Sequence, residues 1–323
     1  MAGHLISAGA TLAGWHTDGT PNTLPGFLKR FPGAPRLAEV DALLDDPGID
    51  LILTAAIPSE RAAIACRAMA AGKDVMTDKP GCLTLQDLEA IRATVRETGR
   101  IWSVDFSERF EVPAVTCASE LVASGAIGEV VQTLGIGPHR LNAGSRPDWF
   151  FDPARNGGIL TDIGSHQIDQ FLHFAGAADA EITLADVQAT RTPGFQDFGQ
   201  IALRAGKAHG YIRVDWFTPD ALPTWGDGRL FVQGTEGAIE LRKYVDVAGR
   251  AGGDHVFLIN GTRHEHIDAG GAGLPYFNRL IDDLSHRTET AMPQPHAFKV
   301  MELAIRAQTE AEGHGPWHAS SPA

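Results

Sequence analysis

Lys79 and its neighbours have the residue types of a proton-transfer site. The lysine follows a predicted strand at 74–78 and precedes Pro80 and Gly81. Pro80 fixes its own φ and restricts the preceding residue to extended conformations, so the lysine ammonium group is held in one direction. An ammonium group aimed into a cleft can exchange a proton with a substrate hydroxyl. The alternative interpretation is a surface lysine in an ordinary strand-to-helix turn.

A second set of candidate groups lies on a predicted helix at 158–174. Asp162 and His166 are four residues apart and therefore share one face, and Asp169 and His173 continue that stripe. A histidine suits proton transfer near neutral pH, and a carboxylate one turn away can orient it or hydrogen-bond a substrate hydroxyl. Surface helices ordinarily carry Lys and Glu on their wet face, so this stripe is unusual.

Two other interpretations of this helix stay open. In one, Asp162 and His166 satisfy each other or neighbouring backbone in the core; in the other, they ligate zinc. The run His264-Glu265-His266 adds candidate zinc ligands, but nothing fixes a third ligand at a recognisable spacing. We therefore predict no metal site.

Short apolar runs alternate with helical patterns in the first third of the chain. We predict strands at 50–56, 74–78 and 101–106, separated by helices at 59–71 and 84–99. This alternation predicts a parallel α/β sheet with right-handed crossovers. Ligands bind outside the carboxyl ends of the strands in such sheets, and Lys79 stands at one of those ends.

The pattern changes after about Arg109. Four further helices are predicted, at 113–124, 158–174, 275–287 and 295–311. Strand-like runs separated by Gly-containing turns lie at 129–135, 181–190, 199–204, 210–217, 229–233 and 238–242. Consecutive strands with short turns predict an open, mainly antiparallel sheet, so the second part is α+β. We divide the chain into domains at 1–108 and 109–323.

The composition is that of a globular protein with an acidic surface. The 323 residues are 43% hydrophobic and 21% charged, which suits two packed domains. The formal net charge of -13 disfavours nucleic acid and anionic membrane surfaces as partners, and no apolar stretch is long enough to span a bilayer. The three cysteines, Cys66, Cys82 and Cys117, match no zinc or redox pair, so we predict reduced thiols in a cytoplasmic protein.

Several motifs together resemble one enzyme family. Asp78-Lys79-Pro80 resembles a Glu-Lys-Pro motif, and the stretch from Gly157-Gly158 to His166 resembles a Gly-Gly…Asp-x-Gly-x-His helix. Two further segments are similar to a domain junction and to a turn before a long strand: Phe106-Ser107-Glu108-Arg109-Phe110 and Ser124-Gly125-Ala126-Ile127-Gly128. These are motifs of the glucose–fructose oxidoreductase, inositol dehydrogenase and rhizopine-catabolism (Gfo/Idh/MocA) family, and they cover nearly the whole chain.

The resemblance implies a Rossmann domain followed by an α+β domain whose open sheet often forms homo-oligomer contacts. It also implies hydride transfer between nicotinamide and a hydroxyl-bearing carbon of a sugar or polyol. Carried over, Lys79 contacts the reacting hydroxyl, Asp162 hydrogen-bonds the substrate, and His166 is the general acid/base. These roles agree with the residue types, because alcohol oxidation removes a proton from oxygen as hydride leaves carbon.

Cofactor and substrate contacts follow from the same resemblance. The expected NAD or NADP contacts are Thr17, Asp18, Ala56, Ile57, Pro58, Asp78, Lys79 and Ser107. An acidic residue that ends the second strand favours NAD, and no arginine follows Asp18 closely to bind a 2′-phosphate, so we prefer NAD over NADP. The candidate substrate contacts are Arg109, His139, Arg140, Arg146 and Trp149.

The start of the chain departs from the family pattern. Residues 1–9 are interpreted as the second half of a first helix and residues 10–16 as the second strand, with no G-x-G-x-x-G turn before them. We therefore expect the first strand and its phosphate loop to be missing, through a miscalled start codon or a truncation. A chain without that loop would bind dinucleotides poorly, because the pyrophosphate loses its helix N-terminus.

Three functions are compatible with these residues. The leading one is an NAD(P)-dependent dehydrogenase or reductase. The second is a glycoside hydrolase or lyase that uses bound nicotinamide as a transient oxidant, and the third is a non-catalytic ligand sensor on the same fold. The missing phosphate loop favours the sensor, whereas the retention of Lys79, Asp162 and His166 favours an enzyme.

Overall fold

The computed structural model describes residues 1–314 and contains the predicted parallel sheet. Its three strands lie in the order β1 (Leu51–Thr54), β2 (Asp74–Asp78) and β3 (Trp102–Asp105). Two helices make the crossovers, α4 (Arg61–Ala70) after β1 and α5 (Leu85–Thr98) after β2. β2 is the middle strand and is buried over its first four residues, as expected of a strand covered on both faces.

The ends of α5 show how the local sequence sets these elements. The Thr84 hydroxyl caps the helix by accepting a hydrogen bond from the Asp87 backbone N–H at 3.0 Å. The helix stops at Gly99, which adopts a left-handed φ of 65° that favours glycine. The chain therefore turns back toward the sheet, and β3 begins at Trp102.

Residues 10–16 do not form the predicted strand. They make a single bridge to an extended neighbour, between Trp15 and Arg36, where the Trp15 N–H bonds to the Pro35 carbonyl at 2.9 Å. A strand needs a partner along its length to satisfy its backbone groups, and the described residues provide none beyond this bridge. The helices of this first segment are α1 (Ala2–Ser7), α2 (Leu24–Arg30) and α3 (Asp41–Leu44).

The second part of the chain builds one eight-stranded sheet in the order β11-β10-β9-β8-β4-β7-β6-β5. β4 (Val130–Pro138) pairs in parallel with β7 (Ala208–Asp215), and the other neighbouring pairs are antiparallel, as predicted for most of the sheet. The remaining strands are β5 (Glu181–Gln188), β6 (Phe198–Ala205), β8 (Arg229–Gly234), β9 (Gly237–Arg242), β10 (His255–Asn260) and β11 (His264–Asp268).

The strands β10 and β11 are not among those predicted. β10 has four consecutive apolar residues, 256–259, of which Val256 and Leu258 are buried and Phe257 and Ile259 are not, so its sequence carries a strand signal that the prediction missed. β11 has the sequence HEHID and alternates between exposed and half-buried positions at the edge of the sheet. Its pairing with β10, more than its own residues, makes it a strand.

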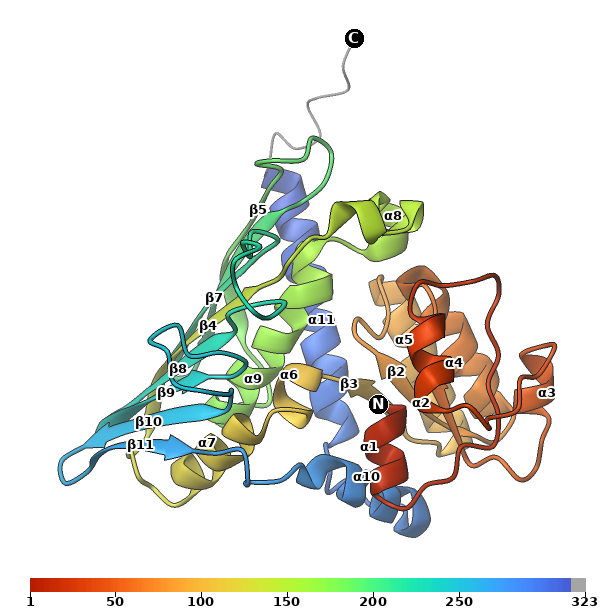
Figure 1. Ribbon diagram of the computed structural model, residues 1–323, viewed down its shortest axis with the longest axis horizontal. Helices are drawn as coiled ribbons and strands as arrows, with labels where there is room; N and C mark the ends of the chain where they lie inside the picture. The colour runs from red at the N-terminus through yellow and green to blue at the C-terminus, as the bar shows by residue number, and fades with distance from the viewer. Residues whose placement is uncertain (315–323) are drawn as a thin grey trace.

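Helices cover one face of the large sheet, and within residues 1–314 no helix lies on its other face (Figure 1). The covering helices are α6 (Ser107–Phe110), α7 (Pro113–Ala123), α9 (Ser165–Ala175) and α11 (Gln294–His314). Two more helices lie beside them, α8 (Pro153–Asn156) and α10 (Pro275–His286). None of the described helices combines the length and apolar character needed to cross a membrane.

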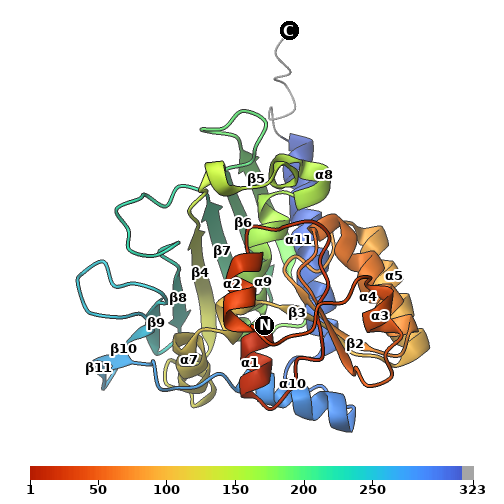
Figure 2. The ribbon, with the colours of Figure 1, turned by 45° about the vertical axis from the view of Figure 1, so that its right-hand side comes forward.

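The helix α11 contacts both sheets (Figure 2). At its start, Gln294 Oε1 accepts a hydrogen bond from the Trp102 backbone N–H at 3.0 Å, and the Phe298 ring stacks on the Trp102 indole. Toward its end, Gln308 Oε1 accepts from the Leu160 backbone N–H at 2.9 Å. One helix therefore connects the edge strand β3 of the parallel sheet to the segment that carries Asp162.

Candidate active site

Lys79 and Asp162 meet between the two parts of the chain. Lys79 follows the last residue of β2, and its peptide bond to Pro80 is cis. Lys79 Nζ donates to Asp162 Oδ1 at 2.7 Å, and the two side chains are 17% and 19% exposed. Although burial alone would raise the pKa of Asp162, the Lys79 charge and hydrogen bond lower it, so Asp162 is a carboxylate at pH 7.

A buried arginine outside the predicted set holds the turn that carries Lys79. Arg61 begins α4 and is only 5% exposed. Its Nη1 donates to the carbonyl oxygens of Asp78 and Pro80, both at 2.9 Å, and its Nε donates to the Ala56 carbonyl at 2.8 Å. One guanidinium therefore ties the segment after β1 to the turn after β2.

Asp162 lies on a π-helical turn and not on the predicted regular helix. The predicted helix at 158–174 is divided into this turn, Leu160–Gly164, and α9. Gly158 enters the turn with a φ of 80°, and a Cβ at this position would lie 2.4 Å from a side chain of α11. A π-helical turn contains more residues than an α-helical one, so Asp162 is rotated relative to His166.

His166 and His139 are neutral at pH 7. Burial lowers the pKa of His166 to about 3, although Glu108 opposes that shift. Burial likewise lowers the pKa of His139 to about 4. Among the described residues, His166 Nδ1 has no hydrogen-bond partner. A neutral imidazole can accept a proton, so His166 has the protonation state that a general base requires.

A buried ion pair stands behind these histidines. Lys243 Nζ and Gln167 Nε2 both donate to Glu108 Oε2, at 2.8 and 2.7 Å. Burial by itself would raise the pKa of Glu108, but Lys243, and then His166, outweigh it and lower that pKa to about 2. Glu108 is therefore a carboxylate at pH 7, and its negative charge acts on the His166 imidazole.

Lys79, His139 and His166 line one cleft of about 430 Å³. This volume is within the range of small-molecule binding sites. The nine other lining residues are Ser107, Glu108, Glu111, Val112, Arg140, Asn142, Arg146, Trp225 and Tyr244. The structure thus brings most of the predicted catalytic and substrate residues to one place, although they come from distant parts of the chain.

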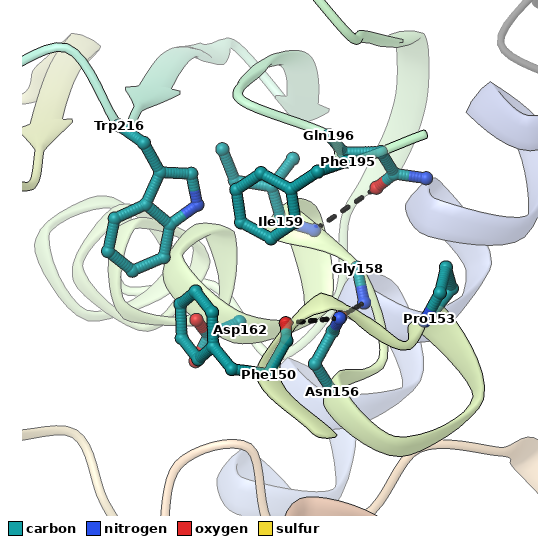
Figure 3. A pocket seen from close by; sticks show the side chains of 9 residues that line it. All are labelled: Phe150, Pro153, Asn156, Gly158, Ile159, Asp162, Phe195, Gln196 and Trp216. Carbon is teal, nitrogen blue, oxygen red and sulfur yellow. Dashed lines mark hydrogen bonds between the residues drawn. The ribbon is translucent and has the colours of Figure 1, made fainter. Parts of the chain in front are cut away.

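A smaller pocket adjoins Asp162 (Figure 3). Its volume of about 20 Å³ accommodates one water molecule and is too small for a sugar. The aromatic rings of Phe150, Phe195 and Trp216 line it, and Figure 3 shows the Asp162 carboxylate beside the Phe150 ring.

Two of the predicted substrate contacts are not among the residues that line the cleft. Arg109 donates to both carboxylate oxygens of Asp169 at 2.6 Å, and His296 Nε2 lies 2.8 Å from the same carboxylate. Asp169 is fully buried, so Arg109 acts as its counter-charge. Trp149 packs edge-on against Phe150, with ring centroids 6.0 Å apart.

Most of the predicted cofactor contacts follow the carboxyl ends of the parallel strands. The segment Ala56-Ile57-Pro58 follows β1, and Asp78 ends β2. Ser107 is the first residue of α6 and lies two residues after the end of β3. It lines the cleft together with Lys79. These positions form the edge at which a parallel sheet binds its ligands.

Thr17 and Asp18 lie in an exposed loop beside Arg36. The Asp18 side chain is fully exposed, with Oδ1 3.3 Å from His16 Nε2. Arg36 Nη2 donates to the Thr17 carbonyl at 3.5 Å. No arginine follows Asp18 closely in the sequence, but the fold brings Arg36 to the adjacent Thr17. Arg36 is distant in sequence and reaches the loop through its bridge with Trp15.

The described residues contain no group of three His, Cys, Asp or Glu side chains arranged to hold a metal ion. His264 and His266 lie on the edge strand β11. His266 Nε2 is 2.9 Å from His255 Nδ1 on β10, so the His266 ring is hydrogen-bonded to the neighbouring strand.

Comparison with known proteins assigns the chain to a family. Residues 24–106 match the oxidoreductase family with an NAD-binding Rossmann fold, and residues 115–240 match the GFO/IDH/MocA C-terminal domain. The two matches lie in the expected order and together span more than half of the chain. The protein belongs to the Gfo/Idh/MocA oxidoreductase family.

Individual relatives agree with this assignment. A structure described as a putative oxidoreductase from Erwinia carotovora atroseptica is 45% identical, with a TM-score of 0.92 over 96% of this chain and 94% of that one. A levoglucosan dehydrogenase in complex with NADH and L-sorbose shares the fold at 21% identity, with a TM-score of 0.73 over 94% of this chain and 88% of that one.

Curated relatives match a smaller share of their length. The scyllo-inositol 2-dehydrogenase (NAD(+)) of Bacillus subtilis is 28% identical over 203 residues, which are 61% of this chain and 56% of that protein. The chain thus spans little more than half the length of such relatives.

The cleft fits the nicotinamide end of the cofactor that the family implies. It opens at the carboxyl ends of the parallel strands and has room for a small molecule beside Lys79 and Ser107. The buried His166 Nδ1 has no hydrogen-bond partner within residues 1–314, so it is free to bond a ligand in the cleft. Ser107 and Lys79 are the lining residues that would hold the ring.

Proposed function

We propose that this protein transfers a hydride between NAD(P) and a hydroxyl-bearing carbon of a sugar, polyol or sugar derivative. The observation that carries the proposal is the 2.7 Å contact of Lys79 with Asp162, beside a neutral His166 on the same cleft. The relatives named for activity on scyllo-inositol and levoglucosan support the substrate class.

Each of the three side chains has a distinct role in this proposal. The Lys79 ammonium donates a hydrogen bond to the reacting oxygen and stabilises the negative charge that develops on it. Asp162 holds Lys79 in place and accepts a hydrogen bond from the substrate. His166, neutral at pH 7, takes the hydroxyl proton during oxidation and returns it during reduction. Nicotinamide, when bound, supplies the hydride acceptor or donor.

The test is a steady-state assay of reduced-nicotinamide absorbance with NAD or NADP and a panel of sugars and polyols. We expect the Lys79→Ala variant to lose at least about 100-fold in kcat, because the developing charge loses its main stabilising group. Lys207→Ala, at an exposed position between β6 and β7, is the matched control and should keep wild-type activity. Unchanged turnover in Lys79→Ala would remove the site assignment.

The same assay separates the two alternative functions. A hydrolase or lyase that uses bound nicotinamide transiently would release product without net reduction of added NAD(P). A sensor would bind sugars without turning them over. The Lys79–Asp162 pair and the neutral His166 favour the dehydrogenase, because a sensor needs no base beside a cation.

NAD is the cofactor we propose, on the basis of the acidic Asp18. The nearby Arg36 supplies a cation that a 2′-phosphate could bind, so the ratio of kcat/KM for NAD over NADP measures the balance between the two residues. We expect Asp18→Ala to lower this ratio and Arg36→Ala to raise it. A ratio that neither change alters would place the adenosine ribose elsewhere.

We further propose that the protein acts in the cytoplasm as a homo-oligomer, with the domain boundary near residue 108. The three free cysteines are typical of a reducing compartment. The buried side chains of the sheet strands alternate with partly exposed apolar ones that lie on the uncovered face, among them Leu134, its cross-strand partner Phe231, and Phe257. Such a face is typical of an interface between copies.

A further inference from the structure

Arg146 is a cation in the cleft without a carboxylate partner. Its guanidinium lies over the rings of Phe150 and Trp216, 4.4 and 5.4 Å from their centroids. Its Nε donates to the Leu141 carbonyl at 2.9 Å, and its Nη2 makes a long contact of 3.5 Å with the Arg140 carbonyl. Within residues 1–314, Nη1 donates to no protein group and no carboxylate forms an ion pair with Arg146.

The nearby Arg140 is compensated only from the solvent side. Its Nε is 3.7 Å from the carboxylate of Asp220, which is fully exposed and therefore screened by water. Its Nη2 donates to two backbone carbonyls, those of Pro219 and Leu222, which fix its position without neutralising it. Arg140 and Arg146 together give one wall of the cleft an excess of positive charge.

The other charged groups of the cleft are matched in close ion pairs. These are Lys79 with Asp162 at 2.7 Å, Glu108 with Lys243 at 2.8 Å, and Glu111 with the Met1 amino group at 2.8 Å. The excess positive charge is therefore confined to the wall formed by the two arginines.

We infer that Arg140 and Arg146 form a subsite for an anionic group of the substrate, a carboxylate or a phosphate. This inference rests on the proposed function and adds a substrate class to it: an acidic or phosphorylated sugar or polyol. The planar guanidinium of Arg146 is already held between rings and a carbonyl, so little conformational entropy is lost when it binds an oxyanion. Arg146 and Lys79 line the same cleft, so one substrate can reach both.

The size of the cleft limits the distance between the anionic group of the substrate and its reacting hydroxyl. Arg146 and Lys79 line one cleft of about 430 Å³, which is the size of a site for a single small molecule. An anionic group on Arg146 and a hydroxyl on Lys79 therefore belong to one small molecule. Uronates, aldonates and sugar phosphates have this arrangement, whereas neutral sugars leave the Arg146 wall unpaired.

The experiment compares acidic substrates with their neutral counterparts. We would measure kcat/KM for D-glucuronate against D-glucose, D-galacturonate against D-galactose, and D-gluconate against D-glucitol, with glucose 6-phosphate as the phosphate arm. Each ligand is also tested for its effect on Tm, which needs no turnover. The proteins are wild type, Arg146→Gln, Arg146→Lys and the control Arg155→Gln. Arg155 lies on α8, and its exposed guanidinium forms an ion pair with Glu60.

We expect the wild type to prefer at least one acidic compound to its neutral counterpart. Arg146→Gln should lower that preference about 10- to 100-fold, the loss of one hydrogen bond to a charged group. Arg146→Lys should restore part of it, and Arg155→Gln should leave it unchanged. Preference for the uronates and aldonates identifies a carboxylate, and preference for glucose 6-phosphate identifies a phosphate.

The outcomes separate this inference from the proposed function. Turnover of neutral sugars with no preference for any acid overturns the anion subsite and leaves the dehydrogenase intact. A rise in Tm with an acid that Arg146→Gln abolishes, without turnover of any compound, supports the subsite and rejects the dehydrogenase. If no acid exceeds its neutral counterpart in either measurement, the subsite is rejected.

Discussion

Replacing Lys243 with methionine would remove the charge that balances Glu108 behind the cleft. Methionine keeps most of the length of the side chain and deletes only the ammonium group, so packing changes little. The Lys243 side chain is fully buried, and its Nζ lies 2.8 Å from Glu108 Oε2. The variant would leave Glu108 as a buried carboxylate with Gln167 as its remaining donor.

The expected loss of stability follows from the pKa of Glu108. In the wild type, burial alone would raise this pKa, but Lys243 and the histidines lower it from 4.5 to about 2. A pKa that is lower in the folded state contributes stability above pH 4.5, and this contribution is lost as the pH falls toward 2. The difference corresponds to roughly 3 kcal/mol at pH 7, similar to the cost of breaking a buried ion pair.

The assay is urea unfolding of the wild type, Lys243→Met and the double variant Glu108→Gln/Lys243→Met at pH 7 and pH 5. We expect Lys243→Met to lose about 3 kcal/mol at pH 7 and the double variant to recover most of that loss. In Lys243→Met, burial without the ammonium raises the pKa of Glu108, so lowering the pH to 5 should reduce the deficit. A single variant as stable as the wild type, or a double variant no better than the single, would refute the reasoning.

Three further predictions concern the site and the sheet. Arg61→Met should lower kcat about 10- to 100-fold in steady-state assays, because the turn that carries Lys79 loses its two contacts from Arg61 and the tie to Ala56 after β1; an unchanged kcat would show that the turn keeps its position without Arg61. Gly158→Ala should lower the free energy of unfolding by about 1–3 kcal/mol, because its φ of 80° and the nearby Gln308 side chain both oppose a Cβ; thermal unfolding measures this, with the exposed Gly261→Ala as control. Phe231→Glu, on the uncovered sheet face, should shift the mass in multi-angle light scattering to that of a monomer, and a mass equal to wild type would exclude this face as the interface.

The sequence predicts the elements that have strong hydrophobic periods. The apolar run of β2 and the capped helix α5 lie where their patterns place them, because burial and capping are local properties. β11 could not be predicted, since its HEHID sequence becomes a strand only through pairing with β10. Residues 10–16 show the opposite case, an apolar pattern that stays irregular because it has one bridging partner.

The sequence pointed to the three candidate catalytic side chains but not to the buried ion pair that lies beside them. Lys79 precedes a proline at a strand end, and Asp162 and His166 have helical spacing, so each carries a local signal. Glu108 and Lys243 are far apart in sequence and carry none, because only the tertiary fold reveals that both are buried. Arg109 was misleading for the same reason, since its partner Asp169 looked like part of the polar stripe.

The register of α11 has a consequence for the catalytic pair. Phe298, near the start of the helix, stacks on Trp102 of the parallel sheet, whereas Gln308 holds the Leu160 backbone at the turn that carries Asp162. Inserting one residue between these two positions would rotate the second half of the helix by about 100° while leaving the first half in place. Gln308 would then point away from Leu160, and Asp162 would lose the support that aligns it with Lys79. The contact between Asp162 and Lys79 thus depends on the number of residues between Phe298 and Gln308. Neither of these two residues is proposed to touch the substrate.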